Sequence, residues 1–301
     1  MGASAVKPGP FAFAHLTDPH LPLAAGDAPL RLLLSKRITG YLSWTRNRQH
    51  IHRPEVLAAL IADVRAHAPD HVAVTGDLAN ISTPGEMARA RDWLASLGPA
   101  ADVTVIPGNH DVYVRDARFG LWAANMQGDR GEGFPFVRRR GPVAFIGATT
   151  GVPTPFFMAH GALGAAQTER LDEILAQLGD EGVCRVVLLH HPPAGKAAAK
   201  RRKGLRDREA FARIVQARGA ELILHGHIHH WTQSSLPGPH GQAPVLSAAS
   251  ASAAPVRHAE PANWNLIRVH GEPGAWRLTA EVRGLAPDGT FHTLRNLDPV
   301  A

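Results

Sequence analysis

The sequence is poor in cysteine and tyrosine, with one cysteine and two tyrosines among 301 residues. A single cysteine excludes an intrachain disulfide, and Cys184 opens an apolar run that is typical of a buried core thiol. No apolar run reaches the ~20 residues that a membrane-spanning helix requires. The segment Met1–Pro10 has one lysine, two prolines and no apolar core, so it does not resemble a signal peptide. We therefore expect a cytoplasmic protein.

The composition is that of an ordinary globular chain, with 45% hydrophobic and 19% charged residues. Its length suits one large α/β domain or two small ones. The net charge of +6 favours anionic partners such as phosphate esters, nucleic acid or acidic lipid surfaces, without choosing among them. The 18 histidines are more informative, because so large a number suggests that some are ligands.

Short β-type runs alternate with helical patterns, which predicts an α/β sandwich. The predicted strands are Phe11–Leu16, His71–Thr75, Val103–Ile106, Val143–Gly147, Arg185–Leu189, Glu221–Leu224 and Pro244–Ser247. The predicted helices are Arg53–His67, a helix from Thr83 to Leu97 that opens with a capping box to Glu86, a helix through Leu171–Leu178, and one that Asp207 caps and Gly219 ends.

The pattern changes near residue 260, where Trp264–Val269 and Trp276–Val282 alternate around a glycine-containing turn. This alternation predicts a C-terminal β-hairpin extension over residues 260–295. No internal repeat or domain boundary is evident, so we expect one domain over residues 1–301.

Two segments interrupt the alternation, and both follow a predicted strand at its carboxyl end, where open α/β sheets bind ligands. Residues 24–52 form an insertion rich in Leu, Arg and Trp, for which we expect a helical cap. Lys196–Arg208 is strongly basic. Together with the loop Thr149–Gly164, these segments are expected to shape the substrate pocket.

Polar side chains follow five separate predicted strands. In chain order the motifs are Asp18-Pro19-His20, Gly76-Asp77, Gly108-Asn109-His110-Asp111, His190-His191-Pro192 and Gly226-His227-Ile228-His229. Because parallel strands end side by side, these groups are expected to converge. Oxygen and nitrogen donors without thiolate suit divalent ions such as Mn, Fe(II), Co or Zn. Their number exceeds the needs of one ion, which favours two ions about 3.5–4 Å apart that share a carboxylate.

This ordered set of motifs resembles the calcineurin-like metallophosphoesterases, and the resemblance extends to about residue 250. It implies a four-layer αββα sandwich. It also implies that Asp18, His20 and His229 hold the first metal, that Asn109, His190 and His227 hold the second, and that Asp77 bridges both. Taken alone, each residue has an ordinary alternative as a loop cap, a turn residue or a core histidine. His191, His225 and His230 are interpreted as neighbours of ligands.

The resemblance further implies hydrolysis without a protein nucleophile, in which a hydroxide that bridges the metals attacks phosphorus. His110 is then the expected general acid for the leaving alkoxide. Asp111 is expected either to orient His110 or to cap a helix, and both interpretations stay open. Gly76, Gly108 and Gly226 stand beside ligands, where a tight turn or a close approach of the backbone is expected.

Features that are absent from these motifs exclude some branches of the family. Residues Gly76–Ser82 differ from the Gly-Asp-x-Val-Asp-Arg-Gly motif of protein serine/threonine phosphatases and dinucleoside tetraphosphatases. Purple acid phosphatases use a tyrosine shortly after the bridging aspartate, and only Tyr41 and Tyr113 are present. The remaining resemblance is to bacterial cyclic-nucleotide and glycerophosphodiester phosphodiesterases, with an anionic phosphoester as substrate.

Several alternatives stay open. They are a phosphomonoesterase, a nuclease, a UDP-diacylglucosamine pyrophosphohydrolase of the lipid A pathway, and a catalytically inactive scaffold like the retromer coat subunit. In the lipid interpretation, Leu30–Leu34 and Trp44 interleave with basic residues to form an amphipathic cap that contacts acyl chains or a membrane. The competing interpretation is a helical insertion packed on the body. Nucleic acid is not expected, because no basic face interleaved with aromatics is evident. The basic segment Lys196–Arg208 is either a lid over a phosphate or a solvated loop.

Overall fold

The computed structural model describes residues 9–24, 26–29, 34–115, 124–298 and 300. The sequence-based interpretations of residues 1–8 and 30–33 therefore lie outside the described residues. No helix in the described ranges is both long and apolar enough to cross a membrane.

The described elements alternate as the sequence indicates. The strands are β1 (Phe11–Leu16), β2 (His71–Val74), β3 (Val103–Val105), β4 (Phe136–Arg140), β5 (Val143–Gly147), β6 (Cys184–Leu188), β7 (Leu222–His225), β8 (Gln233–Gly238), β9 (Gly241–Ser247), β10 (Asn263–His270), β11 (Arg277–Leu285) and β12 (Phe291–Leu297). The helices are α2 (Arg37–Ser43), the π-helix η1 (Trp44–Arg48), α3 (Gln49–Ile51), α4 (Pro54–Ala66), α5 (Pro84–Leu97), α6 (Ala165–Asp180), α7 (Gly195–Ala198) and α8 (Arg208–Arg218).

The strands form two six-stranded sheets. One has the order β12-β11-β10-β1-β2-β3, and the other has the order β4-β5-β6-β7-β9-β8. Within the first sheet β1, β2 and β3 run parallel, and within the second β5, β6, β7 and β9 do so. Parallel neighbours end at the same edge, so the segments that follow them meet there.

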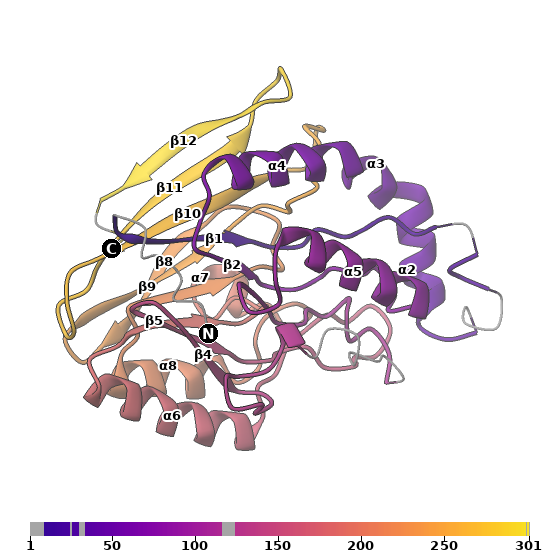
Figure 1. Cartoon of the computed structure of the whole chain (residues 1–301). Helices are drawn as coiled ribbons and strands as arrows, with labels where there is room; N and C mark the ends of the chain where they lie inside the picture. The colour runs from indigo at the N-terminus through magenta and orange to yellow at the C-terminus, as the bar shows by residue number, and fades with distance from the viewer. Residues whose placement is uncertain (1–8, 25, 30–33, 116–123, 299, 301) are drawn as a thin grey trace.

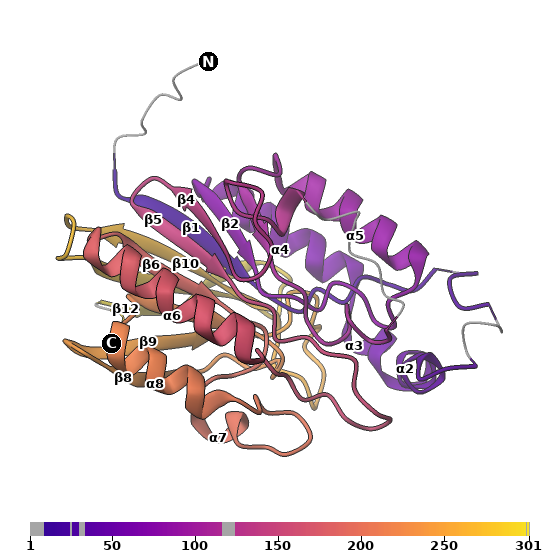
Figure 2. The ribbon, with the colours of Figure 1, turned by 90° about the horizontal axis from the view of Figure 1, so that it is seen from below.

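The sheets pack face to face between two layers of helices. Figures 1 and 2 show α4 and α5 on one side and α6 and α8 on the other. Side chains alternate along β5: Val143 and Phe145 join the core between the sheets, whereas Ala144 and Ile146 join the core beneath α6 and α8. Phe13 of β1 meets Phe145 edge to face at 5.0 Å. The predicted four-layer αββα sandwich is confirmed.

Most predicted boundaries agree with the structure to within a residue or two. The capping box between Thr83 and Glu86 is present at the start of α5. Asp207 precedes α8 but makes no capping bond, so that prediction is wrong. Its carboxylate instead accepts the backbone N–H groups of Leu163 and Gly164, because the loop before α6 packs against it.

The predicted C-terminal hairpin forms as β10 and β11, but β12 extends it to three antiparallel strands. β10 also pairs with β1, so the extension belongs to the first sheet. β12 escaped the sequence analysis because it is an edge strand whose residues are mostly exposed, without apolar alternation. The polar edge strand β8 was missed for the same reason.

The insertion after β1 is helical, as predicted, through α2, η1 and α3. Trp44 and Arg37 of this segment are both buried, and Arg37 donates to the carbonyls of Ile81 and Ser82. Leu34 and Leu42 are exposed. The insertion therefore packs on the body of the protein, and membrane contact stays a prediction.

Candidate metal centre

All seven predicted ligands lie at the edge where the parallel strands end. Asp18 and Asp77 follow β1 and β2, and Asn109 follows β3. The histidines follow β6 and β7 of the other sheet: His190, His227 and His229. Asp18, His20, Asp77 and His190 are fully or almost fully buried. The site thus forms across the junction of the two sheets.

The first group of donors consists of Asp18, His20, Asp77 and His229. Nε2 of His229 lies 3.1 Å from Oδ1 of Asp18 and 3.2 Å from Nε2 of His20. Nε2 of His20 is 3.8 Å from Oδ2 of Asp77. These separations bring one donor atom of each residue to a common centre.

The second group consists of Asp77, His190 and His227. Nε2 of His190 lies 3.3 Å from Oδ2 of Asp77 and 3.2 Å from Oδ1 of Asn109. Asn109 therefore supplies an amide oxygen to the same centre. Asp77 belongs to both groups, which is the arrangement that the sequence analysis assigned to a bridging ligand.

Backbone carbonyls fix the direction of two of the imidazoles. Nδ1 of His20 donates to the carbonyl of Ala79 at 3.2 Å, and Nδ1 of His190 donates to that of Thr75 at 2.7 Å. Nε2 of each ring therefore faces the cluster. A carbonyl that fixes the tautomer in this way is a common feature of metal-binding histidines.

Left-handed backbone conformations gather at the cluster. Five of the seven predicted ligands have a positive φ, between 39° and 72°, namely Asp18, His20, Asp77, His227 and His229. Such conformations are uncommon for residues with a side chain and concentrate at functional sites. The nearby glycines allow this crowding: a Cβ on Gly108 would collide with Asp77, and one on Gly226 would collide with Thr17 and Asp18.

The electrostatics of the cluster suit cations. Oδ1 of Asp18 and Nε2 of His227 are buried and have no hydrogen-bond partner among the described residues. Burial raises the pKa of the Asp18 carboxyl, but His229 and other imidazoles outweigh it and hold that pKa below its usual range. Burial lowers the pKa of His20 and His227, which favours neutral rings. At His190 burial also acts to lower the pKa, but Asp77 and Asp18 outweigh it and raise that pKa to about 9, so an ion bound here displaces a proton. Ionised carboxylates and neutral imidazoles are the protonation states that bind metals, and the residues present fit two divalent ions.

His110 lies beside the cluster but donates its backbone N–H to Oδ1 of Asp77 at 2.7 Å. Its Nδ1 donates to the carbonyl of Asn80 at 2.6 Å, and its ring stacks on Tyr113. Nε2 accepts a hydrogen bond from Nη1 of Arg48 at 2.9 Å. Burial and the Arg48 charge lower the pKa of His110 to about 3.

The position of Asp111 does not agree with the interpretation that this residue orients His110 directly. Its carboxylate accepts the backbone N–H groups of Asp77 at 2.8 Å, Ala79 at 2.8 Å and Gly108 at 2.9 Å. Adjacent side chains in this turn point in different directions, and the carbonyl of Asn80 orients the His110 ring instead. Asp111 ties together the two loops that carry Asp77 and Asn109.

Two residues of the helical insertion reach the site and were not singled out from the sequence. Nη2 of Arg48 donates to Nε2 of His20 at 2.6 Å. His52 is buried, its ring lies 4.5 Å from that of His20, and Nδ1 is 3.0 Å from the Ser252 hydroxyl. The only sequence signal is their four-residue spacing on a helical segment. The residues around them fit either a helical insertion packed on the body or an amphipathic cap for lipid, and neither interpretation places Arg48 or His52 at the ligands.

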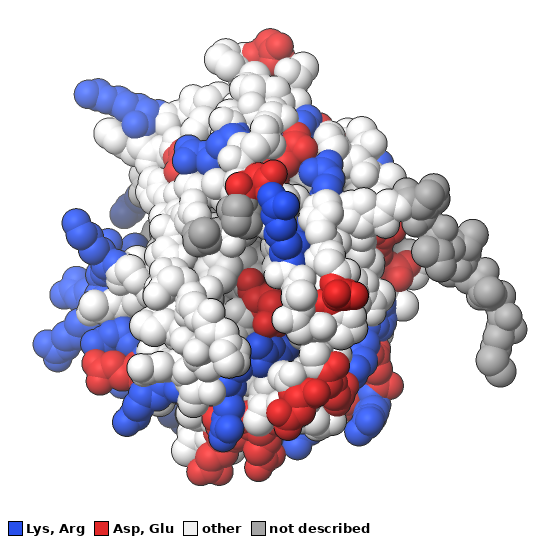
Figure 3. All heavy atoms as spheres, turned by 90° about the vertical axis from the view of Figure 1, so that its left-hand side faces the viewer, with Lys and Arg blue, Asp and Glu red and all other residues white. Residues whose placement is uncertain are grey.

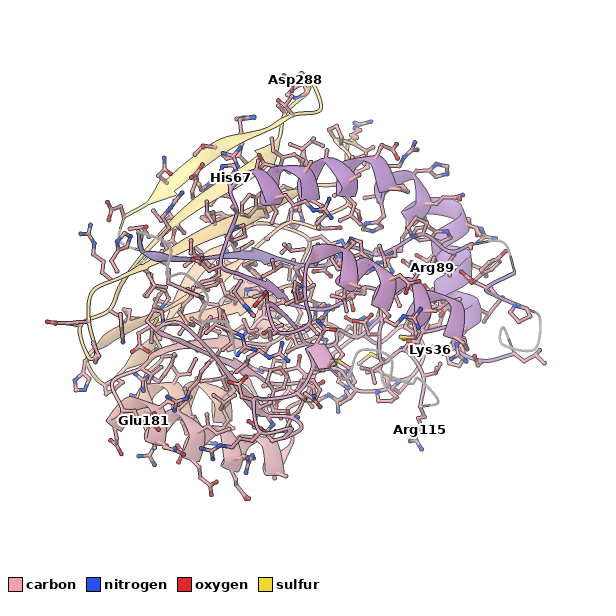
Figure 4. All side chains as sticks on the ribbon, viewed as in Figure 1. Lys36, His67, Arg89, Arg115, Glu181 and Asp288 are labelled. Atoms are coloured by element: carbon pink, nitrogen blue, oxygen red, sulfur yellow. The ribbon has the colours of Figure 1, made fainter. Side chains whose placement is uncertain are left out.

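A cavity of about 550 Å³ opens in front of the cluster, and we call it the front cavity. It is bounded by the insertion through Lys36 and Arg48, by Phe157 of the loop 149–164, and by Lys203 of the basic segment. Lys36 donates to the Thr154 hydroxyl at 2.6 Å, which links the insertion to the loop. Figure 4 shows Lys36 on the α2 side of the molecule. The three segments expected to shape the pocket do line it.

His191, His225 and His230 do not belong to either donor group. His191 lies 2.8 Å from the Thr150 hydroxyl through Nδ1 and donates through Nε2 to the carbonyl of Ala159 at 3.2 Å. It therefore holds the loop 149–164 beside the site. This agrees with its interpretation as a neighbour of a ligand.

Comparison with known proteins identifies a family profile, related sequences and a similar fold. The sequence profile described as calcineurin-like phosphoesterase matches residues 11–231. A probable cyclic nucleotide phosphodiesterase from a Synechococcus species is 26% identical over 73% of this chain and 79% of its own length. A cAMP/cGMP dual specificity phosphodiesterase from Mycobacterium tuberculosis is 30% identical over 56% of this chain and 52% of its own. A dimetal phosphatase from Danio rerio shares the fold, with a TM-score of 0.62 at 14% identity over 97% of this chain and all of its own.

Proposed function

Because the chain belongs to the calcineurin-like phosphoesterase family and is thus a metal-dependent phosphoesterase, we propose that it hydrolyses phosphodiesters with two metal ions. The observation that carries this proposal is the pair of donor groups that share Asp77. The preference for diesters is supported by the two relatives named as cyclic nucleotide phosphodiesterases.

In this proposal each donor group holds one ion. Asp18, His20 and His229 hold the first, Asn109, His190 and His227 hold the second, and Asp77 contacts both. Oxygen and nitrogen donors without thiolate suit Mn, Fe or Zn. When bound, such ions supply an activated water at neutral pH and neutralise charge on the phosphoryl oxygens.

Arg48 is the residue that meets the substrate from the insertion. Its guanidinium lines the front cavity, and no described carboxylate forms an ion pair with it. The lone pair of His20 Nε2 can accept the hydrogen bond from Arg48 or bind an ion, but it cannot do both at once. In the loaded site Arg48 therefore donates to a phosphoryl oxygen, a strong charge-assisted contact.

His110 is proposed to protonate the leaving oxygen. The Asn80 carbonyl holds Nδ1, so the proton must come from Nε2, which Arg48 occupies in this structure. When Arg48 turns to the phosphoryl oxygen, Nε2 is released. The negative charge of the substrate offsets part of the effect that Arg48 and the ions have on the pKa of His110 and favours the protonated ring. Asp111 acts as a positioning residue through the backbone around Asp77.

The test compares bis-p-nitrophenyl phosphate with p-nitrophenyl phosphate on metal-reconstituted protein. We expect faster hydrolysis of the diester, abolished by EDTA and restored by Mn, Fe(II) or Zn. Asp77→Asn serves as the inactive control, because asparagine has the same shape as aspartate and also tolerates a left-handed backbone. Faster hydrolysis of the monoester would show that the protein is a phosphatase and refute the diester preference.

A further inference from the structure

A second cavity of about 650 Å³ adjoins the front cavity, and we call it the lysine cavity. The two cavities share Lys203, His227 and Ile228 in their linings. Because His227 belongs to the second donor group, the lysine cavity opens directly beside the proposed reaction centre. A substrate held at the donor cluster therefore meets two adjoining spaces, each large enough for a small-molecule group.

The lysine cavity is strongly basic. Lys196, Lys200 and Lys203 line it, and no Asp or Glu among the described residues does so. None of these lysines forms an ion pair with a described carboxylate. By contrast, both signs of charge occur on the face opposite α2 (Figure 3). The rest of the lining is polar where β8 begins, at Thr232 and Ser234.

Cations that border a cavity without a paired carboxylate attract an anion. The arrangement favours the phosphate-binding interpretation of Lys196–Arg208, because three exposed lysines of this segment border one cavity. Arg201 and Arg202 of the same segment line neither cavity, so only some of the exposed cations of this segment border the two cavities. Of the cavity-lining lysines, Lys203 also borders the front cavity, which contains the donor cluster.

The position of His110 sets the direction of the substrate. His110 lines the front cavity but not the lysine cavity. The group whose oxygen it protonates must therefore leave from the front cavity. The group that stays attached to phosphorus then extends into the lysine cavity.

We propose that the substrate is a phosphodiester with two separate arms, and that the retained arm carries a further phosphate group bound by Lys196, Lys200 and Lys203. This inference rests on the proposed phosphodiesterase activity. Water adds its oxygen to phosphorus, and the bond from phosphorus to the leaving oxygen breaks. That oxygen takes a proton and departs as an alcohol. The second product is a phosphomonoester that keeps the additional phosphate.

The proposal favours linear over cyclic diesters. A 3′,5′-cyclic nucleotide has both ester oxygens on one sugar and no further phosphate, so it would occupy one cavity and leave the lysines without an anion. A linear diester with a phosphorylated arm would occupy both.

The test uses a matched pair of substrates, p-nitrophenyl thymidine 5′-phosphate with and without a 3′-phosphate on the retained thymidine. We expect kcat/KM to be about tenfold higher with the 3′-phosphate, since each exposed ion pair contributes modestly. In the double variant Lys196→Met/Lys200→Met this ratio should approach one. Arg201→Met removes a charge from the same segment outside the cavity and should keep the ratio.

A binding measurement separates recognition from catalysis. Thymidine 3′,5′-bisphosphate is titrated calorimetrically into EDTA-treated protein, and the double variant should weaken its binding about tenfold, whereas Arg201→Met should not. Equal kcat/KM for both substrates in the unmodified protein, or equal binding by the double variant, would overturn this inference and leave the phosphodiesterase proposal standing. Failure to hydrolyse either substrate with metals bound would contradict the phosphodiesterase proposal itself.

Discussion

Two buried polar clusters of this protein are built in opposite ways. In the anchor formed by Asp63, Trp264 and Arg283, every contact joins a donor to an acceptor. The Asp63 carboxylate accepts from Nε and Nη2 of Arg283 at 2.7 and 2.8 Å, and from Nε1 of Trp264 at 2.9 Å. In the donor cluster, groups that bind cations crowd together: Nε2 of His20 and Nε2 of His229 are 3.2 Å apart, and Oδ1 of Asp18 lies 3.1 Å from Nε2 of His229.

The difference separates stability from chemistry. A satisfied network stabilises the fold, and here it fixes α4 to the C-terminal strands β10 and β11. Buried polar atoms without a hydrogen-bond partner among the described residues, such as Oδ1 of Asp18 and Nε2 of His227, oppose folding and favour a cation. The left-handed backbone at Asp18 and Asp77 adds to this cost. Mutations should therefore affect function at one cluster and stability at the other.

The largest expected effect is at Asp77. Asp77→Asn should lower kcat by at least about 10²–10³-fold, because the residue contacts both proposed ions and a lost transition-state contact costs on this order. Metal analysis should show loss of bound metal, while the melting temperature of the metal-free protein stays equal or rises. Normal metal content with full activity would remove Asp77 from the bridging role.

His110→Gln should lower kcat by about 10²–10⁴-fold, the range typical of general acid catalysis. The loss should be larger for an alkyl ester than for a p-nitrophenyl ester, because p-nitrophenolate departs without a proton. Metal content should not change. An equal loss with both leaving groups would contradict the acid role, and a loss of metal would show that His110 supports the ligands.

Arg48→Gln should lower kcat/KM by about 10–100-fold, because hydrogen bonds to charged groups contribute roughly 1.5–3 kcal/mol. Arg46 lies on the same π-helix but is exposed, so Arg46→Gln is the matched control. The direction of the pH profile is a second readout. Removing the guanidinium takes away a cause of the lowered pKa of His110, so the limb that His110 controls should move to higher pH.

At the anchor, a mutation should lower stability and leave activity unchanged. Arg283→Met should lower the free energy of unfolding by about 1–2 kcal/mol, since it leaves the partly buried Asp63 carboxylate with fewer hydrogen bonds. Denaturant unfolding measures the loss, and kcat/KM should be unchanged. A large loss of activity without a loss of stability would mean that the two clusters are not separate.

The smallest effect concerns His71 on β2, which lies outside both clusters. Burial lowers its pKa to about 3, below the value of 6.5 in the unfolded chain. The unfolded state therefore binds the proton first, and the contribution of His71 to stability falls as the pH drops below 6.5. Between pH 7.5 and 6 the loss should be about 0.8 kcal/mol. His71→Gln should show a correspondingly weaker pH dependence of unfolding than the unmodified protein.

Much of the fold was accessible from the sequence, because local signals and burial agree there. β1 and β5 begin and end where predicted, and α5 begins with its predicted capping box. Edge strands such as β12 were missed, because an exposed strand needs no apolar alternation. Asp207 shows the limit of local signals, since a tertiary contact with the loop before α6 replaces the expected cap.

The candidate site divides in the same way. The sequence alone predicted which side chains converge in the two donor groups, because each predicted ligand follows a strand and parallel strands end at one edge. Only the tertiary structure decided that Arg48 and His52 reach the cluster, that Asn80 rather than Asp111 orients His110, and that Lys196 and Lys200 line a second cavity. The reason is that these contacts depend on how the insertion and the loops pack across the two sheets, and residues far apart in the chain leave no periodic or local signal of such packing.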